Sequence, residues 1–112
     1  MSATVGDMLA ALDGIGLPAT QFEWPEQDAP SLPYAIIAPV EERSLTMDGR
    51  NDLFTVAYDV ELYSRRRDVA LELRVRGALA DAGIQSRRDF YYDSEQHFCI
   101  TYFHCTLTEQ EA

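Results

Sequence analysis

The chain has 112 residues, 46% of them hydrophobic and 25% charged, which is the composition of a globular domain and not of a disordered chain. Nineteen acidic residues against nine basic ones give a formal net charge of −10, and every basic residue is an arginine. Because so acidic a chain is repelled by phosphate backbones, sequence-specific binding to duplex DNA is not expected.

The N-terminal part of the chain predicts a short helix, an irregular connection and a strand. Apolar residues recur at helical spacing over Val5–Leu12, and Thr4 precedes them as an N-cap. Prolines punctuate residues 18–33, so this segment should connect the helix to the next element without regular structure. A strand is predicted over Tyr34–Val40, and Pro39, which lacks a backbone donor, should lie where that strand forms a sheet edge.

The middle of the chain predicts a polar loop followed by the clearest strand. Glu41–Asp52 is polar, with Asp48 and Arg50 near a turn-prone tip, so we predict a loop over residues 41–52. Apolar and polar residues then alternate over Leu53–Tyr63, which is typical of a strand with one buried face.

The C-terminal half predicts a second helix and a second hairpin. Helical spacing of apolar residues covers Val69–Ala82, with Asp68 as the N-cap. Strands are predicted over Arg87–Tyr92 and Gln96–Leu107, joined by a turn, and residues 108–112 are expected to form a flexible tail.

These elements predict an α+β fold in a single domain over residues 1–112. The expected order is α-β-β-α-β-β. It gives a four-stranded, mostly antiparallel sheet with two helices packed on one face.

Membrane and secretion segments are not predicted. No uncharged run approaches the ~20 residues of a membrane span. Asp7 and Asp13 interrupt the N-terminal segment, where a secretion signal requires an apolar stretch. We therefore expect a soluble protein that begins in the cytosol and does not contact a membrane.

Histidines and cysteines near the C-terminus look like a metal-ligand set, but their spacing argues against one. His97, Cys99, His104 and Cys105 lie in or beside one predicted strand, and alternation puts His104 on the face opposite the others. The two cysteines are six residues apart, about 20 Å along a strand, which is too far for a disulfide or for a shared zinc ion. We expect no metal site and no cofactor.

Catalysis is also not predicted. Asp59 and Glu61 share the polar face of the clearest strand, but metal-dependent nucleases commonly add a lysine near such a pair, and the chain has none. Carboxylates on a strand face are more often solvated, or paired with a neighbouring subunit. The serines lie in no strand-turn-helix context that would activate a nucleophile. We expect no catalytic residue.

The arginines after the clearest strand are better candidates for contacts between proteins. Arg65, Arg66 and Arg67, together with Arg87 and Arg88, could bind phosphate. Three arginines between a strand and a helix more often form salt bridges, and acidic partners are plentiful. We therefore favour contacts with acidic neighbours in an assembly. The candidate contact residues are Arg65, Arg66, Arg67, Asp48, Arg50, Asp59 and Glu61.

An ordered set of short patterns, spanning residues 4 to about 107, resembles the tail-completion (tail-terminator) proteins of siphoviruses and their prophages. No single pattern is specific, and the order and spacing make the resemblance. The patterns are Gly16-Leu17-Pro18, Phe22-Glu23-Trp24-Pro25-Glu26, Ala29-Pro30-Ser31-Leu32-Pro33-Tyr34, Glu61-Leu62-Tyr63, Arg67-Asp68-Val69-Ala70-Leu71-Glu72, Ala82-Gly83-Ile84 and Asp93-Ser94-Glu95.

The resemblance implies a structural role in the virion. Proteins of this family assemble as a ring, often a hexamer, on the end of a finished tail tube. The ring contacts the tail tube protein on one side and the head-tail connector or stopper protein on the other. DNA passes through its lumen without specific binding. The expected location is the head-tail interface of the virion, after assembly in the host cytoplasm.

Two other classes of function stay open at this point. One is a neighbouring role in the same neck, as a head-tail adaptor, stopper or minor capsid protein, which the fold alone does not separate from a terminator. The other is a small enzyme or nucleic-acid-binding module, against which the net charge and the lack of lysine argue.

Overall fold

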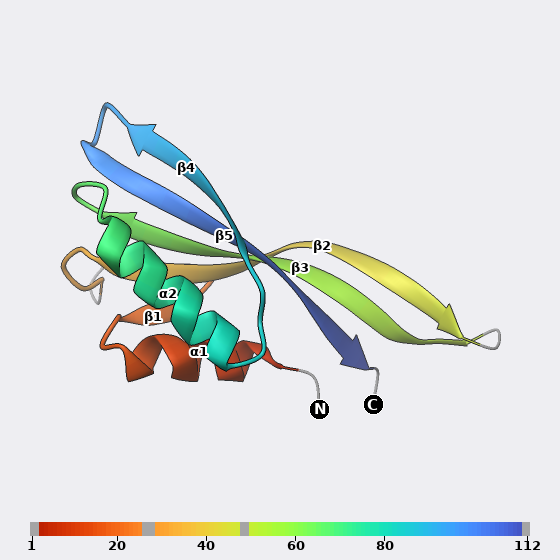
Figure 1. Ribbon diagram of the computed structural model, residues 1–112. Helices are drawn as coiled ribbons and strands as arrows, with labels where there is room; N and C mark the ends of the chain where they lie inside the picture. Colours follow the sequence, from red (N-terminus) through yellow and green to blue (C-terminus); the bar gives the residue numbers. More distant parts are fainter. Residues whose placement is uncertain (1–2, 26–28, 48–49, 111–112) are drawn as a thin grey trace.

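The computed structural model describes residues 3–25, 29–47 and 50–110 (Figure 1). It contains two helices and five strands, and the predicted α+β class is confirmed. In chain order the elements are α1 (Val5–Gly14), β1 (Ala19–Gln21), β2 (Tyr34–Met47), β3 (Arg50–Ser64), α2 (Val69–Asp81), β4 (Arg87–Asp93) and β5 (Phe98–Gln110).

The strands form one mixed sheet in the order β1-β2-β3-β5-β4. β2–β3, β3–β5 and β4–β5 are antiparallel, whereas β1 runs parallel to β2. The prediction of four strands is therefore wrong, as is the predicted element order. The missed strand, β1, has three residues and lies within the segment predicted to be irregular. It is too short for a periodic signal, and its pairing with Ala35–Ile37 is a tertiary contact.

Both helices begin at the predicted caps. The Thr4 side chain accepts a hydrogen bond from the Asp7 backbone N–H, and the Asp7 carboxylate accepts one from the Thr4 N–H, which completes a capping box. At α2, the Asp68 carboxylate accepts from the Leu71 N–H at 3.0 Å. Gly16 and Gly83 follow the two helices with positive φ, a conformation that glycine adopts readily and that helps end each helix.

The predicted loop over residues 41–52 is wrong, because most of these residues extend a long hairpin. β2 continues to Met47 and β3 begins at Arg50, with paired residues along the ladder such as Glu41 with Ala57 and Arg43 with Thr55. The side chains of residues 41–43 are exposed. These residues are polar because this part of the hairpin lies outside the core. Its backbone hydrogen bonds form without apolar side chains. Asp48 lies outside the described residues.

The predicted flexible tail is also mostly strand. β5 runs to Gln110, which pairs with Leu53, and residues 111–112 lie outside the described part of the chain. A side-chain contact adds to the ladder here: Tyr58 Oη donates a hydrogen bond to Glu109 at 2.8 Å.

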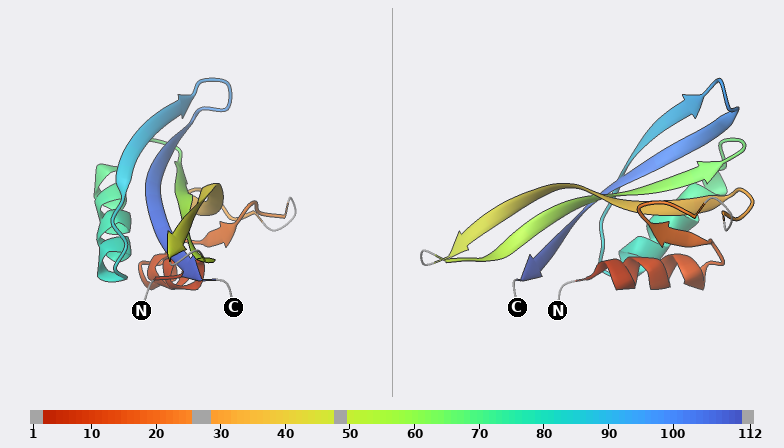
Figure 2. Two further views of the ribbon diagram at one scale, coloured as in Figure 1. Left: turned by 90° about the vertical axis from the view of Figure 1, so that its right-hand side faces the viewer. Right: turned by 180° about the vertical axis from the view of Figure 1, so that it is seen from behind.

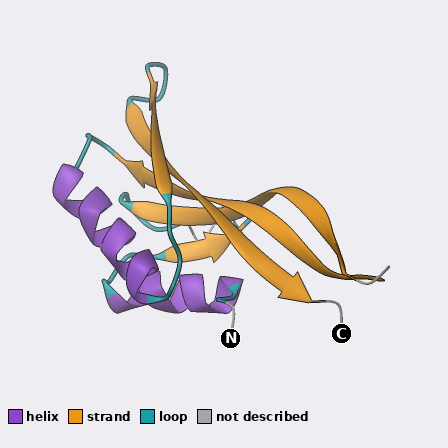
Figure 3. Ribbon diagram, turned by 45° about the vertical axis from the view of Figure 1, so that its right-hand side comes forward, coloured by secondary structure: helices purple, strands orange, loops and turns teal. Residues whose placement is uncertain are grey.

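One face of the sheet and both helices enclose the hydrophobic core (Figures 2 and 3). Alternate residues of β3 turn toward the helices, as the sequence predicted, and matching residues of β2 and β5 join them in register. The helices contribute Met8, Leu12, Leu71, Val75 and Leu79. The sheet contributes Ala35, Ile37, Val56, Tyr58, Val60, Leu62, Phe103, Cys105 and Leu107.

The hairpin gives the molecule an elongated shape, with principal extents of 50 × 27 × 26 Å. Figures 1 and 2 show β2 and β3 reaching well beyond the helices. β1 borders β2 only at residues 35–37, so Pro39 lies on a stretch of β2 that pairs with β3 alone among the described strands. The expected edge position of Pro39 is confirmed, and the register shifts immediately after it, at Val40.

Candidate interaction surface

The sheet face turned away from the helices carries a group of polar contacts that links three strands. We call it the open face. It consists of Ala57, Asp59, Glu61 and Tyr63 from β3, Ile100, Tyr102, His104 and Thr106 from β5, and Arg87, Asp89 and Tyr91 from β4. The predicted candidates Asp59 and Glu61 both lie on it.

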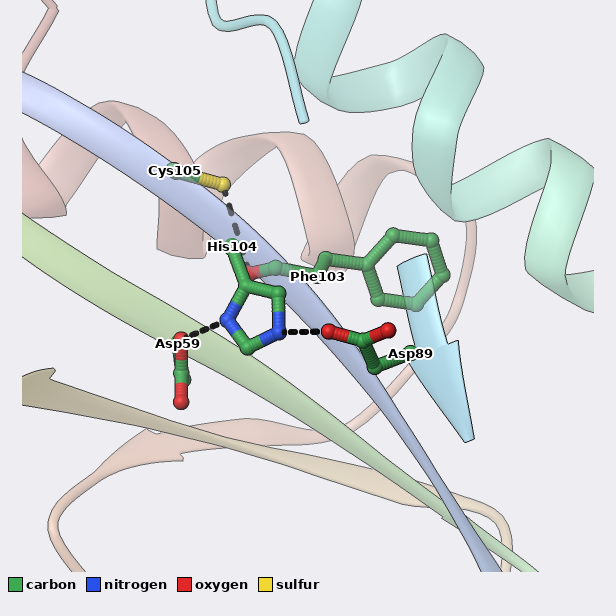
Figure 4. A network of polar contacts seen from close by, with 5 residues as sticks. All are labelled: Asp59, Asp89, Phe103, His104 and Cys105. Atoms are coloured by element: carbon green, nitrogen blue, oxygen red, sulfur yellow. Dashed lines mark hydrogen bonds and ion pairs between the residues drawn. The ribbon is translucent and has the colours of Figure 1, made fainter. Parts of the chain in front are cut away.

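At the centre of the open face, His104 lies between two carboxylates (Figure 4). Its Nδ1 is 2.5 Å from Asp59 Oδ1 and its Nε2 is 2.6 Å from Asp89 Oδ2. The three residues come from β5, β3 and β4, where Asp59 is directly opposite His104 and Asp89 is opposite Tyr102. The cluster therefore ties three strands together across the open face.

This arrangement suits a charged imidazolium. Two carboxylates accept hydrogen bonds and do not donate them, so both ring nitrogens of His104 carry protons when both partners are ionised. Partial burial by itself lowers the pKa of His104, but the hydrogen bonds and negative charges of Asp59 and Asp89 outweigh it, and the pKa is raised. With both nitrogens occupied, His104 has no free lone pair with which to act as a general base.

The cluster predicts a pH-dependent stability. A raised pKa in the folded state means that folding favours the protonated imidazole. The stabilisation is therefore fully present below the unfolded pKa of about 6.5 and is lost as the pH rises through the higher folded pKa. We expect the difference in unfolding free energy between the wild type and His104→Gln to shrink over that window. Urea unfolding at stepped pH measures it.

Asp59→Asn and Asp89→Asn are the matched controls, since each removes one of the two negative partners and keeps the side-chain shape. In each of these variants the pKa of His104 should be raised less. The pH window over which replacing His104 with glutamine changes the unfolding free energy should therefore be narrower. Asp59→Asn should have the larger effect, because the Asp59 side chain is 18% exposed and that of Asp89 is 63% exposed. A stability difference between wild type and His104→Gln that stays constant from pH 5 to 9 would contradict the charged cluster.

A row of aromatic rings crosses the same side of the sheet. Trp24 contacts Tyr34 edge-on at 6.0 Å between ring centroids, Tyr34 is 5.2 Å from Tyr63, and Tyr63 is 5.6 Å from Phe98. The row links the connection after β1 to β2, β3 and β5. Tyr63 Oη also donates a hydrogen bond to Glu61 at 2.7 Å. The rings give this face apolar area beside its charges.

The predicted arginine run divides into two kinds of residue. Arg65 and Arg66 are exposed, and neither makes an ion pair with the described acidic residues. Arg67 instead turns back onto the protein, with Nε 3.5 Å from Glu72 Oε2 and its guanidinium 4.2 Å from the centre of the Phe90 ring. Of the three arginines predicted to contact another protein, Arg65 and Arg66 are therefore available for such a contact.

The structure also contains a buried ion pair that sequence reasoning missed. Glu72 on α2 is completely buried, and Arg88 Nη1 on β4 lies 2.8 Å from Glu72 Oε1. Nothing in the local sequence distinguishes Glu72 from the exposed acids of a helix. Its partner is 16 residues away, so only the packing of α2 against the sheet brings the two together.

The other predicted site residues are not brought together with this surface. Arg50 opens β3 at the far end of the hairpin. Within the described ranges no group of three or more histidine, cysteine, aspartate or glutamate side chains could hold a metal ion. Both cysteines are free, and burial, followed by the charge of Asp59, raises the pKa of Cys105 to about 11.

The helices that the structure describes are too short or too polar to cross a membrane. Comparison of the chain with models of protein families and with curated proteins found no match.

Proposed function

We propose that this chain is a tail-completion protein, a structural virion protein that caps a phage tail tube as a ring, most simply a hexamer, and joins it to the head. The proposal rests first on the ordered patterns over residues 4–107 that resemble this family. The partners it implies are further copies of the chain, the tail tube protein, and the connector or stopper protein. DNA would pass through the ring without specific binding.

The structural observation that carries the proposal is the projecting β2–β3 hairpin. A hairpin that extends beyond its own core leaves backbone donors and acceptors without intramolecular partners at its outer edge. Among the described residues, this edge begins on β2 after residue 37, the last residue that pairs with β1. Such an element suits a ring subunit, because it can reach an adjacent copy while the helix-covered half of the domain stays rigid.

The distribution of charge adds support. A ring made from one kind of subunit uses two different surfaces at each contact, one from each neighbour. Arg65 and Arg66 are exposed at one end of β3, and acidic Asp59, Glu61 and Asp89 lie on the open face. Arginines on one surface and carboxylates on another are complementary between copies, although Asp59 and Asp89 already share the charge of His104.

Capping of tail tubes tests the proposal. Tubes assembled from the tail-tube protein of the same genome should stop growing and acquire a ring at one end when this protein is added, as seen by negative-stain microscopy and light scattering. Tubes that stay uncapped at every protein concentration would overturn it. In particles lacking the protein, overlong tails fit a terminator, whereas normal tails beside leaking heads would point to a stopper instead.

A pair of charge variants tests the predicted contacts. Arg65→Glu with Arg66→Glu should raise the concentration needed for capping by about tenfold or more, because like charges then face each other across the contact. Arg65→Lys with Arg66→Lys keeps the charge and should cap nearly as well as the wild type. Equal capping by both double variants would remove these arginines from the interface.

A further inference from the structure

β4 forms one edge of the sheet and carries an unusual amount of exposed aromatic surface. Among the described strands it pairs only with β5. Its three consecutive aromatic residues, Phe90, Tyr91 and Tyr92, are 50%, 55% and 53% exposed. Natural edge strands usually discourage pairing with another chain through charges, prolines or bulges. Here the aromatic run Phe90–Tyr92 has none of these, although Arg87, Arg88 and Asp89 precede it and Asp93 follows it.

The sequence of β4 is complementary to itself in one antiparallel register. When Phe90 is placed opposite Phe90 of a second copy, Arg87 comes opposite Asp93, and Arg88 comes opposite Tyr92. Both ends then hold opposite charges, Phe90 meets Phe90 and Tyr92 meets Arg88, which are favourable cross-strand pairs, while Tyr91 comes opposite Asp89. We propose that β4 pairs with β4 of a second copy about a two-fold axis at Phe90, forming a dimer with one continuous ten-stranded sheet.

The two nearest alternative registers are disfavoured by charge. A two-fold axis between antiparallel edge strands must be perpendicular to the sheet, so the corresponding faces of the two copies lie on the same side. The register can then shift only in steps of two residues. A shift in one direction puts Asp89 opposite Asp89 of the second copy. A shift in the other puts Asp89 opposite Asp93 of the second copy. Like charges directly opposite each other are destabilising, and only the register centred on Phe90 pairs all seven residues of the strand, so this register is favoured.

The sheet faces agree with this register. Arg87 and Asp93 both belong to the open-face side of β4, so their side chains meet on the same side of the joined sheet. Arg88, Phe90 and Tyr92 belong to the helix side. Phe90 is already held there between Arg67 and Arg88, at 4.2 Å and 5.5 Å from its ring centre, so little side-chain freedom is lost on pairing.

Seven paired residues span about 23 Å, which is a small contact, so the dimer should be reversible and concentration-dependent. This inference stands independently of the proposed function, since it concerns the purified chain in the absence of a tail tube. The protein can fail to cap tail tubes and still dimerise, or cap tubes without dimerising. The proposed function and the proposed dimer are therefore overturned by different results.

Sedimentation velocity over a range of protein concentrations tests the dimer. The wild type should change from monomer to dimer as its concentration rises. Arg87→Asp places two aspartates opposite each other at both ends of the contact and should weaken dimerisation by about tenfold or more. Arg74→Asp makes the same charge change on an exposed arginine of α2, outside β4 and outside the proposed ring contact, and should not. Circular dichroism confirms that each variant is folded.

Engineered cysteines test the register, in a Cys99→Ser background that leaves the buried Cys105 in place. Phe90→Cys puts two Cβ atoms about 5 Å apart across the two-fold axis, so mild oxidation should give a disulfide-linked dimer. Tyr92→Cys is the matched control. Tyr92 is similarly exposed, but its two copies would be about 14 Å apart, beyond the reach of a disulfide.

Three results would overturn the proposal. The first is a wild type that stays monomeric at millimolar concentration. The second is a dimer whose affinity is unchanged by Arg87→Asp, because its contact then lies elsewhere. The third is a Tyr92→Cys variant that crosslinks as well as Phe90→Cys, because the register is then wrong.

Discussion

Replacing Phe103 with alanine is expected to lower the free energy of unfolding by about 4 kcal/mol. Phe103 is completely buried, lies at the middle of β5 opposite Val60, and is the largest of the fully buried side chains. Removing its ring takes away apolar contacts and leaves a cavity between the sheet and the helices. Since domains of this size are stable by about 5–15 kcal/mol, this loss is a large fraction of the total stability. Urea unfolding followed by circular dichroism measures the change.

Tyr102→Ala is the matched control, because the adjacent residue removes a ring of similar size from the other face of the same strand. Tyr102 is partly exposed and stacks on His104 at 6.3 Å. Its loss should destabilise by only about 1 kcal/mol. Equal effects of the two substitutions would mean that the open face is as deeply packed as the helix face, contrary to the fold described.

The second large effect is expected at the buried ion pair. Arg88→Met should destabilise the protein by about 3 kcal/mol, because the Glu72 carboxylate stays buried without its partner at 2.8 Å. Arg67 compensates little: its Nε is 3.5 Å from the carboxylate, and its side chain is 52% exposed. Thermal and urea unfolding both measure the loss.

A double variant distinguishes the effect of the unpaired Glu72 charge from the effect of losing the packing of Arg88. Glu72→Met with Arg88→Met replaces the pair by apolar side chains and should recover most of the lost stability, because no unpaired charge is then buried. Arg66→Met, at an exposed arginine, should be nearly neutral. A double variant as unstable as Arg88→Met alone would show that the arginine acts through packing on Phe90 and not through the carboxylate.

In the candidate site, the sequence predicts which face a residue lies on but not which residues contact it. The alternation over residues 53–63 placed Asp59 and Glu61 on a polar face, and the structure agrees. It did not predict that Asp59 shares His104 with Asp89, because those contacts span 45 and 15 residues and depend on the register of three strands. His104 was placed on the opposite face from the cysteines in its strand, but its partners were not predicted.

The hairpin and β1 show a different limit. Hydrophobic periodicity detects strands that bury one face, and both β1 and the outer part of the hairpin bury little. Glu41 and Arg43 therefore predicted a loop, although their backbones are paired with Ala57 and Thr55. A ladder of backbone hydrogen bonds has no signature in side-chain polarity, and a three-residue parallel strand has almost none of any kind.

Local chemistry by itself determined the two helices, their caps at Thr4 and Asp68, the buried face of β3 and the β4–β5 hairpin, because each depends on residues within a few positions of one another. Tertiary structure alone decided the strand order, the length of the hairpin, the burial of Glu72 beside Arg88 and the carboxylates around His104. These depend on which distant strands lie side by side, and a residue's neighbours across a sheet are set by register and not by its own sequence context.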